Sequence, residues 1–158
     1  MPTLNVLFGT ESGNSEKLAM SIENTAKELT KLAGDKAKFD VVRKNLKDLK
    51  VADLEKMDNI VVVISTWGEG DPPGSCEKFC NELYKATSPN LSGKNYAVLA
   101  MGDRSYADFC GCGRRVDESL ARLGANSIMT RKDMDLDYAS HFENWEVELF
   151  TKLSPVLV

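Results

Sequence analysis

Three short apolar runs, each followed at once by a loop that contains glycine, most constrain the fold of this chain. The runs are residues 4–8, 60–64 and 96–100. The middle run is too continuous for a strand with one face in water, so these segments predict strands buried on both faces, as in parallel sheets covered by helices. The three loops then lie beyond the carboxyl ends of the strands, where open α/β sheets bind their ligands.

The rest of the chain alternates between helical and strand patterns. Helices are predicted around residues 18–29, 79–83, 116–123 and 142–153, and further strands at 39–43 and 127–130. Ser140 and Glu143 have the spacing of a capping box at the start of the last helix. Because crossovers between parallel strands are right-handed, the pattern predicts one doubly wound α/β domain, residues 1–158, with a five-stranded parallel sheet and helices on both faces.

The first loop, residues 10–15, has the composition of a phosphate cradle. Its hydroxyl side chains and backbone N–H groups stand where a helix begins, and the positive end of the helix dipole favours an anion there. Gly13 lets the backbone approach such an anion closely. The loop has no lysine or arginine, unlike the P-loop of nucleoside triphosphatases, so we expect a single phosphate monoester. An ordinary helix N-cap is the alternative interpretation.

The second and third loops each add an aromatic residue. Trp67 belongs to the loop after residue 64, and Tyr106 to the loop after residue 100. Either ring could serve packing alone, Trp67 in the core and Tyr106 at the edge of a helix. Together with a phosphate cradle on the neighbouring strand, however, the two rings predict a pocket for a flat heterocycle that carries a phosphate tail.

The three loops, in this order, resemble those of the flavodoxins and of the FMN domains of diflavin reductases. The resemblance extends from about residue 4 to residue 150; the second loop is more similar to the diflavin domains, and the third, ending in Phe109-Cys110, to short-chain flavodoxins. It implies FMN as the cofactor and the sheet order 2-1-3-4-5. It also implies that Trp67 and Tyr106 flank the two faces of the isoalloxazine, and that the carbonyl of Gly68 turns toward the flavin N5.

The resemblance places the cofactor in all three loops and requires no catalytic residue, since the flavin supplies the redox chemistry. His141, the only histidine, is expected in solvent, and the spacings of the four cysteines match no common zinc or iron–sulfur pattern. Neither a metal site nor a disulfide is expected; whether Cys110 contacts the flavin stays open. The predicted cofactor-binding residues are Thr10, Glu11, Ser12, Gly13, Asn14, Ser15, Ser65, Thr66, Trp67, Gly68, Glu69, Met101, Gly102, Asp103, Tyr106, Phe109 and Cys110.

Acidic residues gather in and near these loops, although the net charge of the chain is only -4. We interpret them as an acidic collar that steers the protein toward basic partner surfaces and disfavours added negative charge on the flavin. Solvated polar loops without such a role are the alternative. The collar consists of Glu69, Asp71, Asp103, Asp108, Asp133, Asp135 and Asp137.

These features predict a low-potential one-electron carrier, a flavodoxin that shuttles electrons between reductases and acceptor enzymes. A flavodoxin-like NAD(P)H:quinone reductase and the FMN module of a diflavin reductase are the alternatives; because the chain begins with Met1 and ends soon after the last helix, we expect a separate carrier. A phospho-acceptor receiver would need acidic residues where Thr10 and Ser65 stand. We expect a cytoplasmic monomer that meets basic-surfaced redox proteins transiently and binds neither nucleic acid nor membrane.

Overall fold

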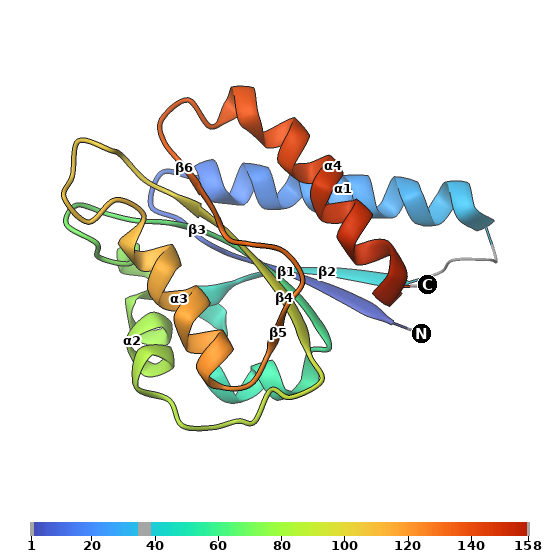
Figure 1. Cartoon of the computed structure of the whole chain (residues 1–158), viewed down its shortest axis with the longest axis horizontal. Coiled ribbons are helices and arrows are strands. Elements are labelled where there is room, and N and C mark those ends of the chain that lie inside the picture. Colours follow the sequence, from blue (N-terminus) through green and yellow to red (C-terminus); the bar gives the residue numbers. More distant parts are fainter. Residues whose placement is uncertain (1, 35–38, 158) are drawn as a thin grey trace.

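A parallel sheet in the order β2-β1-β3-β4-β5 forms the centre of the molecule (Figure 1). The computed structural model describes residues 2–34 and 39–157. The inner strands β1, β3 and β4 are buried along nearly their whole length, as their continuous apolar runs predict. The fold class and the strand order are thus confirmed. The strands of this part of the sheet are β1 (Thr3–Gly9), β2 (Asp40–Asn45), β3 (Asn59–Ser65) and β4 (Asn95–Met101).

The edge strand differs from the prediction, because it is broken into β5 (Asn126–Ser127) and β6 (Lys132–Met134), which both pair with β4. Ser127 lies opposite Tyr96 and Lys132 opposite Leu99, so four residues of the edge stand against two of β4. The predicted strand at 127–130 is therefore wrong beyond its first residue. The extra residues bulge out of the ladder, which allows Met129 to enter the core.

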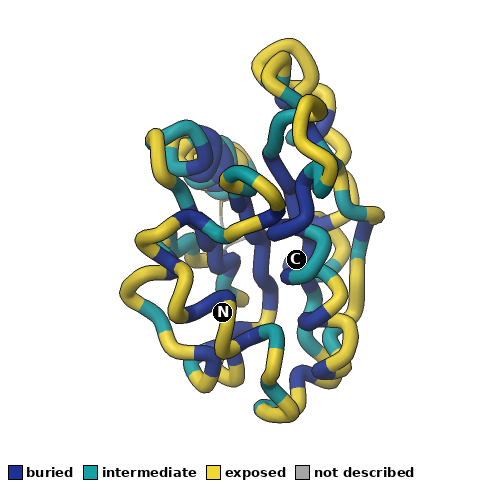
Figure 2. Tube along the Cα trace, turned by 90° about the vertical axis from the view of Figure 1, so that its left-hand side faces the viewer, coloured by how far each residue is buried: buried dark blue, intermediate teal, exposed yellow. Residues whose placement is uncertain are grey.

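Helices cover both faces of the sheet and form two separate apolar layers (Figure 1). Side chains alternate along each strand, so Val61 and Val63 of β3 face one layer while Val62 and Ile64 face the other. Figure 2 shows these buried stretches inside a shell of exposed loops and helix faces. One layer contains α1 (Asn14–Ala33) and α4 (Ala139–Leu157); the other contains α2 (Glu77–Lys85) and α3 (Gly111–Arg122), with the short helices η2 (Leu46–Asp48), η3 (Val51–Lys56) and η4 (Gly74–Cys76).

The last helix confirms the predicted apolar face but not the predicted cap. Phe142, Trp145 and Leu149 are buried against the sheet. Helix α4 begins at Ala139, so Ser140 is already helical, and its hydroxyl donates to the carbonyl of Asp137 at 2.9 Å. The capping box is therefore wrong. Across residues 2–34 and 39–157, none of the helices has both the length and the apolar character needed to cross a bilayer.

Candidate functional site

The three predicted loops meet around one open pocket of about 350 Å³ at the carboxyl edge of the sheet. Figure 1 shows the turns that follow β1, β3 and β4 close together at this end, because parallel strands all point their carboxyl ends the same way. The topology thus brings together residues that are far apart in the sequence, such as Glu11 and Tyr106. The predicted residues that line the pocket are Glu11, Ser12, Asn14, Ser65, Thr66, Trp67, Gly68, Met101, Gly102, Asp103 and Tyr106.

The first loop presents an uncapped helix N-terminus to this pocket. Gly13 is the N-cap of α1, has a φ of 91°, and no described side chain caps the helix. Thr10 shapes the loop from inside, since its Oγ1 accepts a hydrogen bond from the Gly13 amide at 2.8 Å. The first-turn amides of a helix have no acceptor within it, so they are available to an anion beside Ser12 and Asn14. This arrangement contradicts the interpretation of the loop as an ordinary side-chain cap.

Ser15 holds the loop from below instead of lining the pocket. It is fully buried, and its hydroxyl oxygen lies 2.6 Å from that of Ser65 at the end of β3. Glu11 ties the loop to the segment after the second loop, because its carboxylate accepts a hydrogen bond from the Gly74 amide. The phosphate cradle is therefore attached to β3 and to the residues that lead into α2.

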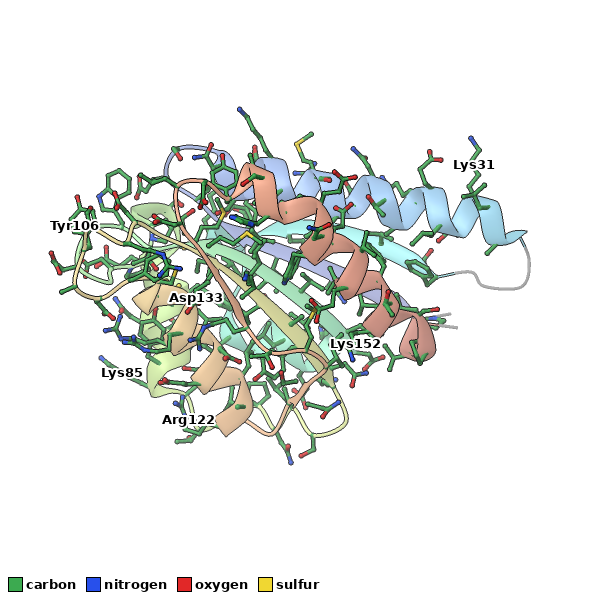
Figure 3. The ribbon with its side chains drawn as sticks, turned by 45° about the horizontal axis from the view of Figure 1, so that its top comes forward. Lys31, Lys85, Tyr106, Arg122, Asp133 and Lys152 are labelled. Carbon is green, nitrogen blue, oxygen red and sulfur yellow. The ribbon has the colours of Figure 1, made fainter. Side chains whose placement is uncertain are left out.

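Two aromatic side chains form exposed walls of the pocket. Trp67 is 57% exposed and Tyr106 is 43% exposed, and Figure 3 shows Tyr106 projecting at the loop end of the molecule. Neither ring packs in the core, so the packing interpretation of Trp67 is wrong. Large apolar groups left open beside a pocket are typical of binding sites. Gly68, next to Trp67, has a φ of 52°, a conformation in which glycine carries no steric penalty.

Several predicted residues lie behind the loops, away from the pocket surface. Cys110 is buried in a left-handed conformation with a φ of 56°, and its thiol donates to the Met134 carbonyl at 3.7 Å. Burial raises the pKa of the Cys110 thiol to about 12. Phe109 packs under the guanidinium of Arg104, 4.7 Å from the ring centre. The predicted residues that do not line the pocket are Thr10, Gly13, Ser15, Glu69, Phe109 and Cys110.

A fourth loop, which follows β6, completes the pocket and was not among the predicted site residues. Asp135, Leu136 and Tyr138 line the pocket, and the Leu136 side chain is 71% exposed. This loop, like the other three, directly follows the carboxyl end of a strand, and that position is the sequence signal that could have identified it. It was hidden because the edge strand was expected to end at residue 130 and not at Met134.

The acidic collar is weaker than its composition predicts, because arginines pair with part of it. Asp108 binds Arg114 and Arg115, with N···O distances of 2.8 and 2.5 Å. These hydrogen bonds, led by that of Arg115, lower the pKa of the Asp108 carboxyl. Arg131 likewise binds Asp133 at 2.8 Å.

Two further members of the collar also have a partner. Asp135 lies 3.5 Å from Arg104, and Asp137 lies 3.0 Å from the exposed ring of His141.

Glu69 and Asp71 are exposed beside the pocket. Asp103 accepts hydrogen bonds from the Ser105 hydroxyl and amide, which lower the pKa of its carboxyl. Among the described residues, Glu69, Asp71 and Asp103 are thus the members of the collar for which no ion pair is seen, so their charge is the least compensated.

The fold and the pocket define a doubly wound α/β protein with a phosphate-type cradle and two aromatic walls. The Flavodoxin family model matches residues 6–145, and the chain belongs to the flavodoxin family, whose cofactor is FMN. The donor set fits this group, since neutral amides and hydroxyls face the space for a phosphate and flat rings flank the rest. The predicted family and cofactor are thus confirmed, whereas the contact of each single residue with FMN stays a prediction.

Relatives and solved structures agree with this assignment. The chain is 37% identical over 142 residues to the sulfite reductase [NADPH] flavoprotein alpha-component of Bacillus subtilis, a match that covers 90% of this chain and 22% of that protein. It is similar in structure to a cysteine-to-serine mutant of flavodoxin from Pseudomonas aeruginosa, with a TM-score of 0.78, 21% identity, and coverage of 96% and 98%. A short-chain flavodoxin associated with a PDU bacterial microcompartment gives a TM-score of 0.75 at 25% identity, with coverage of 98% and 100%.

Proposed function

We propose that this chain carries single electrons on bound FMN between a reductase and an acceptor enzyme, and that it has no substrate of its own. The observation that carries the proposal is the pocket itself, in which an uncapped helix N-terminus and two exposed aromatic walls meet at the carboxyl edge of the sheet. FMN supplies the redox chemistry when it is bound. The chain's own residues bind it, orient it and tune its potential.

Each part of the pocket has a role in this proposal. The first-turn amides of α1, with Ser12 and Asn14, hold the phosphate through neutral donors at the positive end of the helix. Trp67 and Tyr106 flank the isoalloxazine, and the loop around Gly68 supplies backbone groups at its edge. Because both rings are exposed, the flavin edge between them is open to a partner, which suits transfer between proteins.

The charges around the opening support transient contact with basic redox partners. Glu69, Asp71 and Asp103 lie at or beside the pocket mouth, and complementary fields raise association rates and fix orientation more than they raise affinity. We propose a cytoplasmic monomer that acts as one domain over residues 1–158. Neither nucleic acid nor a membrane takes part in this proposal.

A second candidate, the FMN module of a diflavin reductase, is favoured by the curated relatives. The chain spans between 22% and 24% of the length of the sulfite reductase flavoproteins that it matches. In such an arrangement the electron donor is a covalently attached reductase domain and not a separate protein. Both candidates use the same pocket and differ only in how the donor is delivered.

Stopped-flow mixing of the FMN-loaded chain with NADPH tests the proposal. A carrier should be reduced only slowly by NADPH alone, and quickly once a separate flavodoxin reductase is added. Rapid direct reduction by NADPH would overturn it in favour of an NAD(P)H:quinone reductase. If the added reductase has no effect but a fused reductase domain restores rapid reduction, the module is the correct description.

A further inference from the structure

The loop that carries Trp67 is a small hairpin whose far side is fixed by a side chain from α3. Trp67 and Asp71 exchange two backbone hydrogen bonds, with N···O distances of 2.7 and 2.9 Å. Gly68, Glu69 and Gly70 form the tip between them. The carbonyl of Gly70 accepts a hydrogen bond from Nη1 of Arg115 at 2.8 Å.

The same guanidinium also holds the loop that carries Tyr106. Nη2 of Arg115 lies 2.5 Å from Oδ2 of Asp108, which is two residues beyond Tyr106. Arg114 holds the other carboxylate oxygen at 2.8 Å, so Asp108 is fixed from two sides. The fit is tight, because a Cβ on Gly70 would collide with the Asp108 carboxylate. A single side chain, that of Arg115, therefore hydrogen-bonds to both of the loops that carry the aromatic walls.

We propose that Arg115 is a positioning residue that sets the spacing between the Trp67 and Tyr106 walls and, through it, the affinity for a planar ring. The inference rests on the proposed function, since the ring is that of FMN. Arg115 itself is not among the residues that line the pocket. It acts through Gly70 on one wall and through Asp108 on the other.

The geometry needs an arginine and not merely a positive charge. A guanidinium is planar and presents its donors in a fixed fork, so one side chain serves a carbonyl and a carboxylate in a defined geometry. A lysine ammonium keeps the charge but is a point on a flexible stem. Arg115→Lys therefore separates positioning from charge, and Arg115→Gln removes both.

Arg122 provides a matched control on the same helix. Its Nη2 donates to the carbonyls of Leu83, Tyr84 and Ala86 at 3.0 to 3.1 Å, and Figure 3 shows it well away from Tyr106. Arg122→Lys therefore also replaces an arginine that donates hydrogen bonds to backbone carbonyls, but these carbonyls lie outside the pocket loops. Thermal unfolding of each apoprotein measures any general loss of stability.

The first experiment titrates each apoprotein with FMN and with riboflavin. Arg115→Lys should weaken both ligands by the same factor, about tenfold, which corresponds to ~1.4 kcal/mol. The ratio of the two affinities should stay constant because the phosphate cradle is held separately by Ser15 and Thr10. Arg122→Lys should leave both affinities within about twofold of the original protein, a difference below ~0.5 kcal/mol.

The second experiment needs no flavin and measures amide hydrogen exchange in the apoprotein. The Asp71 amide, which donates to Trp67 at 2.9 Å, should exchange at least about tenfold faster in Arg115→Lys, but not in Arg122→Lys. If the original protein does not bind FMN, the proposed function fails, while this measurement still decides whether Arg115 braces the hairpin.

Three results would overturn the proposal. Arg115→Lys could match Arg122→Lys in both ligand affinity and Asp71 exchange. Arg115→Lys could keep the original affinities while Arg115→Gln loses them, in which case the charge matters and the spacing does not. If Arg115→Lys fails to fold, Asp108→Asn replaces it, because this change keeps the shape but loosens the same bridge; unchanged flavin affinity in that variant counts against the proposal.

Discussion

The hydroxyl oxygen of Ser15 lies 2.6 Å from that of Ser65, which lines the pocket. Ser15 lies in the first turn of α1 and Ser65 ends β3, so the contact joins the phosphate cradle to the centre of the sheet. Ser15 is fully buried, and a buried hydroxyl that loses its partner is costly. This pair therefore connects the stability of the fold with the shape of the site.

Replacing Ser15 with alanine should lower both stability and FMN affinity. We expect the free energy of unfolding of the apoprotein to fall by about 1 kcal/mol, because the hydroxyl loses its contacts with Ser65 and with the Met101 sulfur, and the Ser65 hydroxyl is left without this partner. FMN affinity should fall by less than tenfold, as measured by fluorescence titration. Ser21→Ala is the control, since its hydroxyl donates to Glu146 at 3.0 Å on another face. Equal FMN affinity in the two variants would show that Ser15 does not support the phosphate cradle.

The cradle should select FMN over both riboflavin and FAD. Hydrogen bonds to a charged group contribute about 1.5 to 3 kcal/mol each, so the loss of the phosphate should weaken riboflavin by orders of magnitude. FAD should also bind poorly, because donors arranged around a terminal phosphate leave no path for an adenylate extension. Titration of the apoprotein with all three ligands measures this difference. Equal affinities for FMN and riboflavin would show that residues 10–15 do not bind the phosphate.

Gly68→Ala should shift the first reduction potential, not only stability. Gly68 has a φ of 52°, and an added Cβ would meet no atom within 4 Å, so the cost is backbone strain alone. That strain is about 1 to 2 kcal/mol. Gly93, with a φ of 84° and equally open space, is a matched control that precedes β4 and so lies at the opposite end of that strand from the pocket.

Both glycine variants should therefore lose similar stability in urea unfolding, while only Gly68→Ala should lower the first potential. The reason is that the tip around Gly68 supplies the carbonyl proposed to face the flavin N5. A potentiometric titration of the two FMN-loaded variants makes the comparison. Identical first potentials would reduce Gly68 to a tight-turn glycine.

The Asp108 ion pairs should make stability depend on acid pH. Arg115 and Arg114 lower the pKa of the Asp108 carboxyl in the folded protein relative to the unfolded chain. A lowered folded pKa stabilises the protein above the unfolded pKa of about 3.9, and this contribution disappears as the pH falls through the folded pKa. The difference in unfolding free energy between the original protein and Asp108→Asn should thus be largest near neutral pH. Urea unfolding at several pH values measures it, and a gap that is the same in acid would refute the linkage.

The central strands and three of the four pocket loops could be predicted from the sequence for one physical reason. Strands buried on both faces, such as Asn59–Ser65, leave continuous apolar runs, and parallel pairing forces their carboxyl ends to one edge. The broken edge strand left no such run. Its bulge depends on Met129 entering the core and on Arg131 reaching Asp117 of α3 at 3.1 Å, contacts that exist only in the folded chain.

For the charges of the site, too, the sequence reveals which residues are present but not which of them pair in the folded chain. The acidic residues of the collar are visible in the sequence, but their partners are not. Arg115 lies seven positions beyond Asp108, and Arg104 lies far in sequence from Asp135. Only packing shows that these carboxylates are paired, while Glu69 and Asp71 are exposed beside the pocket and Asp103 lines it.

Converting those three carboxylates to amides should raise the second reduction potential and leave the first nearly unchanged. Fully reduced FMN is expected to carry a negative charge, so a nearby carboxylate disfavours the second electron more than the first. A unit charge about 10 Å away at an effective dielectric near 20 contributes roughly 1.7 kcal/mol, or on the order of 70 mV for a one-electron couple. Solvent exposure and salt screening reduce this to a few tens of millivolts for each residue near the flavin.

Asp133→Asn provides the contrast for this last experiment. Its carboxylate is already paired with Arg131 at 2.8 Å and takes no part in the bridge between the two aromatic walls, so removing its charge should not raise the second potential as the removal of an unpaired carboxylate does. The triple amide variant should also associate more slowly with a basic redox partner at low salt, and the difference should shrink as salt rises. Potentiometric titration and stopped-flow kinetics test the two effects separately. An unchanged second potential in the triple variant would show that the exposed carboxylates guide docking, at most, and do not tune the flavin.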